Sequence, residues 1–152
     1  MSRSDYRALK YRWDEPCLGS YVRPLRGYPG GIIGKHVIAA MQADARILVV
    51  DDEPQWREAI AESLGDRGHD VTCANSAAEG VRALQKQQFD GVTIDGLNGD
   101  WPQVYNTAGQ QGARPLVISG DDRIAGQVGN DNFMSKGHYE PERFSRIWPD
   151  NQ

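Results

Sequence analysis

The side chains best suited to chemistry stand where short apolar runs end. Four such runs are followed or closed by charged or hydroxyl residues: Asp51, Asp52 and Glu53 after RILVV, Asp95 in DGVTID, Ser119 in RPLVIS, and Lys136 after NFMS. Three carboxylates on one rim repel one another and should not all stay ionised unless a cation joins them. We expect such a site to bind a hard divalent cation. Mg²⁺ suits a shallow acidic site because it keeps several waters and readily coordinates a phosphoryl oxygen.

The apolar runs themselves predict the strands that carry these residues. Arg46 to Val50 is short, β-branched and almost continuously apolar, as in a parallel strand that is covered on both faces. Further strands are expected at four places: residues 70–74, 90–95, 114–119 and 132–135. In an open α/β sheet the functional crevice lies at the carboxyl ends of the strands, so the charged residues would share one crevice.

Helices are predicted between the strands. Pro54 stands where a helix could begin, and an apolar stripe follows at Trp56, Ile60 and Leu64. Ser76 and Glu79 form the S-x-x-E capping box of a second helix. The remaining helical segments are a weak helix over 101–111, no more than a turn or two between 119 and 133, and a final helix over 141–148. This alternation predicts an open, doubly wound α/β fold with a five-stranded parallel sheet.

Length and composition fit one domain with an appendage. The chain has 152 residues, of which 39% are hydrophobic and 25% charged, and its mean hydropathy is -0.63. No apolar run approaches the roughly 20 residues of a spanning helix, and no signal-peptide pattern opens the chain. Cys17 and Cys73 match neither a metal-ligand pair nor a disulfide framework. We therefore expect a cytoplasmic protein with free thiols and no membrane partner.

Four pieces taken together resemble the receiver domain of two-component response regulators: ILVVDDEP, the lone Asp95 closing the third strand, LVISGD and FMSKG. The resemblance covers residues 45–148. It implies a CheY-like, flavodoxin-like fold of strand order 2-1-3-4-5, here with shortened third and fourth helices. Because the chain stops at Gln152, soon after the final helix, we expect a stand-alone regulator with no fused DNA-binding domain.

The resemblance also implies site residues and their roles. The implied Mg²⁺ ligands are Asp51, Asp52, Asp95 and the main-chain carbonyl of Leu97. The implied residues of phosphoryl chemistry and switching are Asp95 as phosphoacceptor, Lys136 as the invariant lysine, Ser119 as the switch hydroxyl and Phe133 as the aromatic that reorients. A carboxylate can attack phosphorus when a metal and cations neutralise the transferring group, so these roles are physically consistent.

The implied function is signalling rather than ordinary enzyme catalysis. Asp95 would accept a phosphoryl group from a histidine kinase or histidine phosphotransfer protein, and slow self-hydrolysis would reset it. Output would pass through changed contacts with a downstream protein target or through a homodimer.

The chain departs from the family pattern at three places. Gly137 stands where the family usually has a proline joined by a cis peptide, and glycine does not favour that bond. The spacings Asp95 to Ser119 and Ser119 to Lys136, of 24 and 17 positions, are shorter than usual. The loop after Asp95 is also unfamiliar, although Asn98 and Asp100 could reach the rim. These departures favour an alternative, a pseudo-receiver that acts as an adaptor without phosphorylation.

Each of these side chains could instead have an ordinary structural role. The acidic trio could be solvated at a helix N-terminus, Lys136 could be surface charge, Ser119 a turn hydroxyl and Phe133 plain core. A metal-dependent phosphatase with an aspartyl nucleophile is disfavoured, because Leu97 stands where such enzymes usually place a second acid. The three histidines lack partners at metal spacing and are assigned no chemistry: His36, His69 and His138.

Charge divides the chain near Met41. Residues 1–43 carry seven basic and three acidic side chains, whereas the remainder carries ten basic and eighteen acidic ones. Glycines interrupt this segment, so we expect residues 1–43 to be an extension with little regular structure and residues 44–152 to be the receiver domain. We favour an overly early start codon or a disordered segment. There are two alternatives. The segment could be an arm that binds nucleic acid or an acidic partner, or it could fold back and mask the phosphorylation face.

Overall fold

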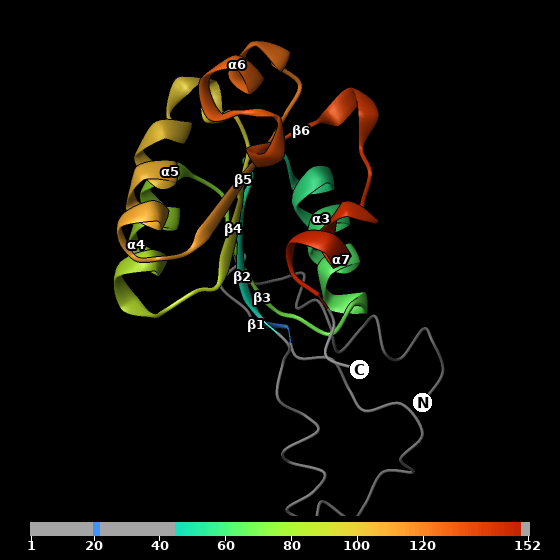
Figure 1. The fold of residues 1–152 in the computed structure, drawn as a ribbon. Coiled ribbons are helices and arrows are strands. Elements are labelled where there is room, and N and C mark those ends of the chain that lie inside the picture. Colours follow the sequence, from blue (N-terminus) through green and yellow to red (C-terminus); the bar gives the residue numbers. More distant parts are fainter. Residues whose placement is uncertain (1–19, 22–44, 150–152) are drawn as a thin grey trace, which may run out of the picture.

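The computed structural model describes residues 20–21 and 45–149, which form a sheet between two helical layers (Figure 1). The strand order is β1-β3-β2-β4-β5-β6. The strands are β1 (Ser20–Tyr21), β2 (Arg46–Val50), β3 (Asp70–Ala74), β4 (Gly91–Ile94), β5 (Arg114–Ser119) and β6 (Phe133–Ser135). Strands β2 to β6 are all parallel, which confirms the predicted five-stranded order 2-1-3-4-5.

Strand β1 is an addition that the sequence patterns did not predict. It pairs antiparallel with β3, with Ser20 opposite Thr72 and Tyr21 opposite Val71. The rest of the expected extension, residues 1–43, lies outside the described residues, as do Cys17 and His36. Cys73 lies on β3 and is half-buried.

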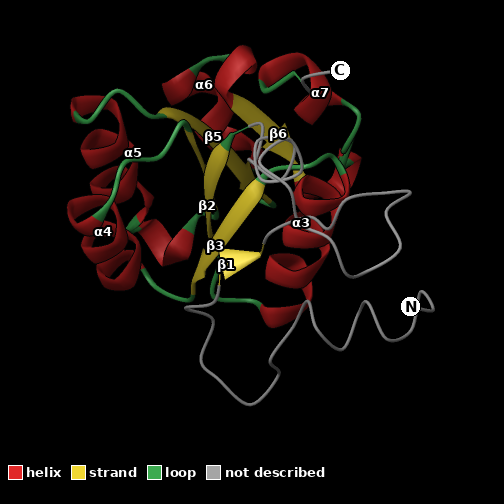
Figure 2. Cartoon of the chain, turned by 90° about the horizontal axis from the view of Figure 1, so that it is seen from below, coloured by secondary structure: helices red, strands yellow, loops and turns green. Residues whose placement is uncertain are grey.

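Five α-helices cover the sheet in the described part of the chain: α3 (Pro54–Asp66), α4 (Ala77–Lys86), α5 (Trp101–Gln110), α6 (Ala125–Val128) and α7 (Arg143–Ile147). Helices α4 and α5 lie on one face of the sheet and α3 and α7 on the other, as the view from below also shows (Figures 1 and 2). None of these helices combines the length and the apolar character needed to cross a bilayer.

The shortening expected after β5 falls mainly on the fourth helical segment. It consists of a single 3₁₀ turn, η2 (Asp122–Ile124), and the four residues of α6. Helix α5 keeps ten residues, the same length as α4. The final helix is shorter than the predicted 141–148, because turn hydrogen bonds to the carbonyls of Glu140 and Pro141 precede α7.

The predicted capping box of α4 is present in modified form. Ser76 Oγ accepts the Glu79 N–H at 3.2 Å, as expected for an N-cap serine. Glu79 Oε2 accepts a hydrogen bond from the Asn75 N–H at 3.0 Å. In a regular capping box Glu79 would accept the N–H of Ser76 itself, so here the second bond comes from the residue before the N-cap.

Two apolar cores flank the sheet because strand side chains alternate between its faces. Leu48 and Val50 belong to the core under α4 and α5, while Ile47 and Val49 belong to the core under α3 and α7. Trp148 closes the second core where α7 ends: a Cβ on Gly91 would lie 2.2 Å from Trp148 Cζ2. The indole thus packs directly on the β4 backbone, which requires glycine at that position.

Candidate functional site

Four carboxylates converge at the carboxyl ends of β2 and β4. Oxygens of Asp51, Asp52, Glu53 and Asp95 all lie within 4.8 Å of one another. Asp51 is buried, with 1% of its surface exposed, whereas Asp52 and Glu53 are exposed and Asp95 is half-buried. The parallel order of the strands brings these acids together, as their positions at strand ends predicted.

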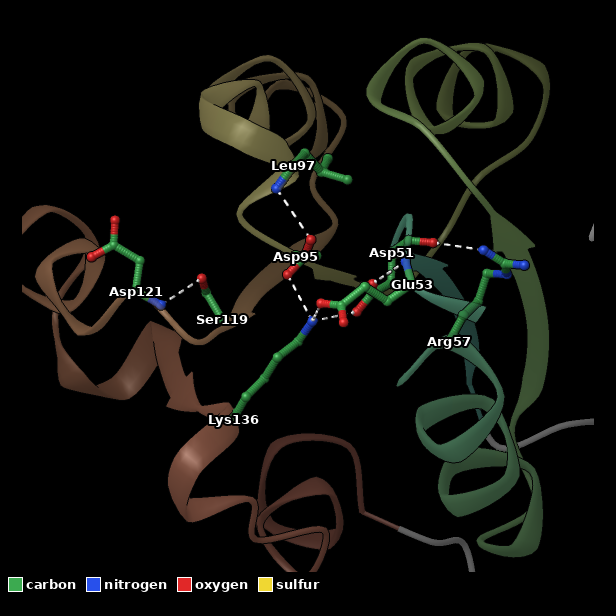
Figure 3. Close-up of polar contacts among 8 residues, drawn as sticks. All are labelled: Asp51, Glu53, Arg57, Asp95, Leu97, Ser119, Asp121 and Lys136. Atoms are coloured by element: carbon green, nitrogen blue, oxygen red, sulfur yellow. Dashed lines mark hydrogen bonds and ion pairs between the residues drawn. The ribbon is translucent and has the colours of Figure 1, made fainter. Parts of the chain in front are cut away.

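Lys136 places its ammonium among these acids (Figure 3). It begins the 3₁₀ turn η4 (Lys136–His138) directly after β6. Its Nζ lies 2.9 Å from Asp95 Oδ1, 3.0 Å from Asp51 Oδ2 and 3.0 Å from Glu53 Oε1. The Trp56 ring centroid lies 5.1 Å from the same nitrogen, in reach of a cation–π interaction. One cation therefore balances three acids.

Backbone contacts fix the buried acid. The Glu53 N–H donates to Asp51 Oδ1 at 2.8 Å, and Arg57 Nη1 donates to the Asp51 carbonyl at 2.9 Å (Figure 3). Pro54 starts α3 directly after this turn. The predicted helix start thus holds the acidic trio at the strand end, where their negative charge also faces the positive end of the helix dipole.

The acids titrate differently because their surroundings differ. Burial raises the pKa of Asp51 to about 6, and the charge of Asp95 adds to the rise. Two factors raise the pKa of Asp52: its hydrogen bond with Asp95 is the larger and burial is the smaller. Burial also opposes ionisation of Asp95, but the hydrogen bonds from Lys136 and Asp52 hold its pKa below the ordinary value. Despite burial, hydrogen bonds to the three acids raise the pKa of Lys136. Among Asp51, Asp52 and Asp95, only Asp95 is therefore held more firmly as an anion than an ordinary aspartate.

The turn after β4 orients Asp95. Leu97 and Asn98 both adopt positive φ, of 51° and 53°, which is uncommon for residues other than glycine. In this turn the Leu97 N–H donates to Asp95 Oδ2 at 3.2 Å. The Leu97 carbonyl, expected as a metal ligand, accepts the Asp100 N–H at 3.0 Å. A carbonyl has two lone pairs, so one acceptor position is left on it.

Of the two expected switch residues, Ser119 lines the same pocket as Asp95, whereas Phe133 lies in the apolar core. Ser119 is buried at the end of β5, and its Oγ accepts the Asp121 N–H at 3.0 Å (Figure 3). Phe133 is buried in the core that also contains Leu97 and Ile124. The structure therefore shows the Ser119 hydroxyl bound to the Asp121 N–H and the Phe133 ring packed in the core.

Gly137 takes part in a contact that proline could not make. Its N–H donates to Ser135 Oγ at 3.2 Å, which caps η4. The described residues contain no cis peptide, so the Lys136 to Gly137 bond is trans. Lys136 nevertheless reaches Asp95.

A pocket of about 810 Å³ opens next to Asp95. Its lining includes Asn98, Ser119, Asp121 and Arg123. Arg123 makes two hydrogen bonds to the Asp121 carboxylate, at 2.8 and 2.9 Å. Asn98, which we expected at the rim of the site, lines this pocket. Asp100 instead donates its N–H to the Leu97 carbonyl within the turn.

Sequence reasoning gave no role to several residues of the site. Glu53 was expected on the rim but not as a partner of Lys136, and Trp56 was expected only as part of an apolar stripe. Asp121 and Arg123 carried no recognisable signal, because exposed charges in a loop are common.

Comparison with known proteins agrees with this geometry. TcrA, a transcriptional regulatory protein of Mycobacterium tuberculosis, is 31% identical over 114 residues, which span 67% of this chain and 44% of TcrA. A response regulator from Burkholderia pseudomallei, solved with a phosphorylated aspartic acid, calcium ion and citrate, is 25% identical with a TM-score of 0.55, covering 66% of this chain and 64% of that one. The described body of the chain is a response regulator receiver domain. No family model matches the chain.

A third comparison bears on the receiver fold. The receiver domain of the sensor histidine kinase PA1611 from Pseudomonas aeruginosa has a magnesium ion coordinated in its active-site cleft. It is 22% identical with a TM-score of 0.53, and the match covers 70% of this chain and 98% of that domain. The present chain spans less than half the length of TcrA, so the activity of a whole regulator does not transfer with the receiver domain.

The donor set of this receiver domain fits a divalent metal. All four clustered side chains offer carboxylate oxygens, the hard ligands that Mg²⁺ and Ca²⁺ prefer. Burial is the main cause of the raised pKa of Asp51, and the charge of Asp95 contributes to the raised pKa of both Asp51 and Asp52, so repulsion among the acids persists beside Lys136. The acidic cluster therefore offers the oxygen ligands that a hard divalent ion needs.

Proposed function

We propose that this receiver domain accepts a phosphoryl group on Asp95 from a histidine kinase or histidine phosphotransfer protein. The observation that supports it is the position of Asp95, whose two oxygens contact the Lys136 ammonium at 2.9 Å and the Leu97 N–H at 3.2 Å. These contacts keep the carboxylate ionised and oriented, which a nucleophile requires. Phosphorylation would change protein contacts and so transmit the signal.

In the proposed transfer, an Asp95 oxygen attacks the phosphorus of a phosphohistidine. A P–O bond forms, the P–N bond breaks, and the released imidazole takes a proton from solvent. The Lys136 ammonium is placed to pair with the new phosphoryl oxygens. Ser119 would leave the Asp121 N–H and donate its hydroxyl proton to the same group, and Phe133 would repack as the space changes.

We propose Mg²⁺ as the cofactor, held by Asp51, Asp52, Asp95 and the Leu97 carbonyl. When bound, Mg²⁺ would neutralise negative charge on the acids and on the transferring group. The four acidic side chains near one another support this choice of site.

The proposed unit is the receiver domain, residues 44–152, which acts on a protein target or through a homodimer. The domain is a phosphoacceptor that promotes its own transfer and slow hydrolysis, rather than an enzyme acting on a separate substrate.

Intact-mass analysis tests the proposal. The full chain is incubated with acetyl phosphate, with and without Mg²⁺, beside Asp95→Asn and the control Asp131→Asn, which changes an exposed acid on η3 (Asn130–Asn132). The wild type and the control should gain one phosphoryl group only with Mg²⁺, and Asp95→Asn none. No gain in the wild type, together with no Mg²⁺ binding, would support the adaptor alternative.

A further inference from the structure

The Ser119 hydroxyl rests against the residue that follows the phosphoacceptor. A Cβ on Gly96 would lie 2.9 Å from Ser119 Oγ, closer than such atoms approach in proteins. The next neighbours, Ile124 Cδ1 at 3.6 Å and Ser119 Cβ at 3.8 Å, would be ordinary contacts. The hydroxyl therefore occupies space that is free only because residue 96 has no side chain.

The backbone does not demand glycine at this position. Gly96 has φ -59° and ψ -25°, a right-handed helical conformation open to any amino acid. Its neighbours Leu97 and Asn98, by contrast, have positive φ without being glycine. The space taken by Ser119 Oγ is thus the feature of this turn that excludes a side chain at residue 96.

One donor defines the resting position of the hydroxyl. Ser119 is 4% exposed, and a buried hydroxyl needs a hydrogen-bond partner. The Asp121 N–H supplies it at 3.0 Å. Asp121 is itself held in place, since its carboxylate accepts the Arg123 N–H at 3.1 Å and both guanidinium contacts from Arg123.

We propose that Gly96 is a positioning residue for the switch, because its missing side chain lets the Ser119 hydroxyl rest on the Asp121 N–H. The inference rests on the proposed function, in which that hydroxyl moves to the phosphoryl group. A side chain at residue 96 would remove this resting position and leave Ser119 Oγ the other staggered rotamers.

NMR on the full chain tests the local effect. In Gly96→Ala, the Ser119 Hα–Hβ couplings should report a changed χ1, and the Asp121 amide should exchange with solvent about five- to tenfold faster because it has lost its acceptor. The control is Gly126→Ala, where a Cβ meets no atom within 4 Å. The control should leave both readouts unchanged. Unchanged couplings and amide exchange in Gly96→Ala would overturn the proposal.

A double-mutant cycle separates this role from a general packing effect. Gly96→Ala alone should lower the Tm by about 2 to 5 °C, the cost of a displaced hydroxyl and a broken hydrogen bond. In the Ser119→Ala background the same change should leave the Tm unchanged or raise it, because the close contact is gone and alanine restricts the unfolded chain. Equal losses in the two backgrounds would mean that Gly96 does not act through Ser119.

Failure of this inference and failure of the proposed function are distinguishable. The NMR couplings, the amide exchange rates and the Tm values are all measured on unphosphorylated protein. The mass analysis instead detects phosphorylation of the wild type. A wild type that accepts phosphate, combined with an unmoved Ser119 in Gly96→Ala, overturns the positioning role alone. A displaced Ser119 with no phosphorylation in the wild type overturns the proposed function and leaves only the local effect of Gly96.

Discussion

Lys136 Nζ lies 2.9 Å from Asp95 Oδ1, so a cation from the end of β6 pairs with an acid from the end of β4 across the intervening strand β5. The same nitrogen also contacts Asp51 and Glu53 at the end of β2. The lysine therefore links the carboxyl ends of three strands. Its charge offsets acids that would otherwise repel one another within a partly buried cluster.

Lys136→Met should destabilise the metal-free protein by about 2 to 3 kcal/mol. The change leaves the buried carboxylate of Asp51 without its cation, although exposure of Glu53 reduces the penalty. Urea unfolding with a chelator present measures the loss, and added Mg²⁺ should recover part of it. Lys86→Met, at the exposed end of α4, should cost less than about 1 kcal/mol. Similar losses in the two variants would contradict the role assigned to Lys136.

Asp51→Asn should make the metal-free protein more stable at pH 7, by about 2 kcal/mol. Burial raises the pKa of Asp51 from 3.8 to about 6, so the folded state binds this proton more tightly than the unfolded state. The stability that the group contributes is therefore present below about pH 4 and is lost as the pH rises through 6. Unfolding free energies between pH 4 and 7, compared between wild type and variant, isolate this slope. A constant difference across that range would refute the expectation.

Mg²⁺ affinity should fall as the pH drops below about 6. Since metal binding requires ionised Asp51, whose pKa is about 6, each pH unit below that value should weaken binding about tenfold. Calorimetric titrations from pH 7.5 to 5 provide the measurement. Asp131→Asn should follow the wild-type curve, because residue 131 is exposed on η3 rather than in the acidic cluster. An affinity that does not change over this range would show that Asp51 is not a ligand.

Gly91→Ala should destabilise the fold by about 1 to 3 kcal/mol or more. The new Cβ would meet three atoms of the Trp148 ring at 2.2 to 2.5 Å, and neither the rigid indole nor the β4 backbone can yield easily. Gly109→Ala is the matched control. It adds a Cβ in open space within α5 and should be neutral or stabilising by up to about 1 kcal/mol. Thermal or urea unfolding compares the two, and an equally stable Gly91→Ala protein would contradict this packing.

The sheet was predictable because its strands are local patterns. The β-branched run from Arg46 to Val50 and the run RPLVIS match β2 and β5 at both ends. The S-x-x-E box likewise marked the start of α4, because capping depends on residues only three positions apart. The final helix was overestimated, since Pro141 begins a turn that a helical pattern cannot distinguish from a first helical turn.

The candidate site was predictable in its residue types, because each acid, hydroxyl and lysine stands at a strand end and parallel strands share one rim. The contacts that each of these residues makes were not predictable from the sequence. That Lys136 contacts Glu53 as well as Asp51 and Asp95, or that it lies over Trp56, depends on distances between segments far apart in the chain.

The sequence by itself determined the α/β alternation and the set of charged residues at its strand ends, since both follow from periodicity and residue chemistry within short windows. Tertiary structure alone decided which oxygens Lys136 bridges, where the Ser119 hydroxyl rests and why residues 91 and 96 are glycine. The physical reason is that these features depend on through-space contacts between residues far apart in the chain, and local patterns carry no information about such distances.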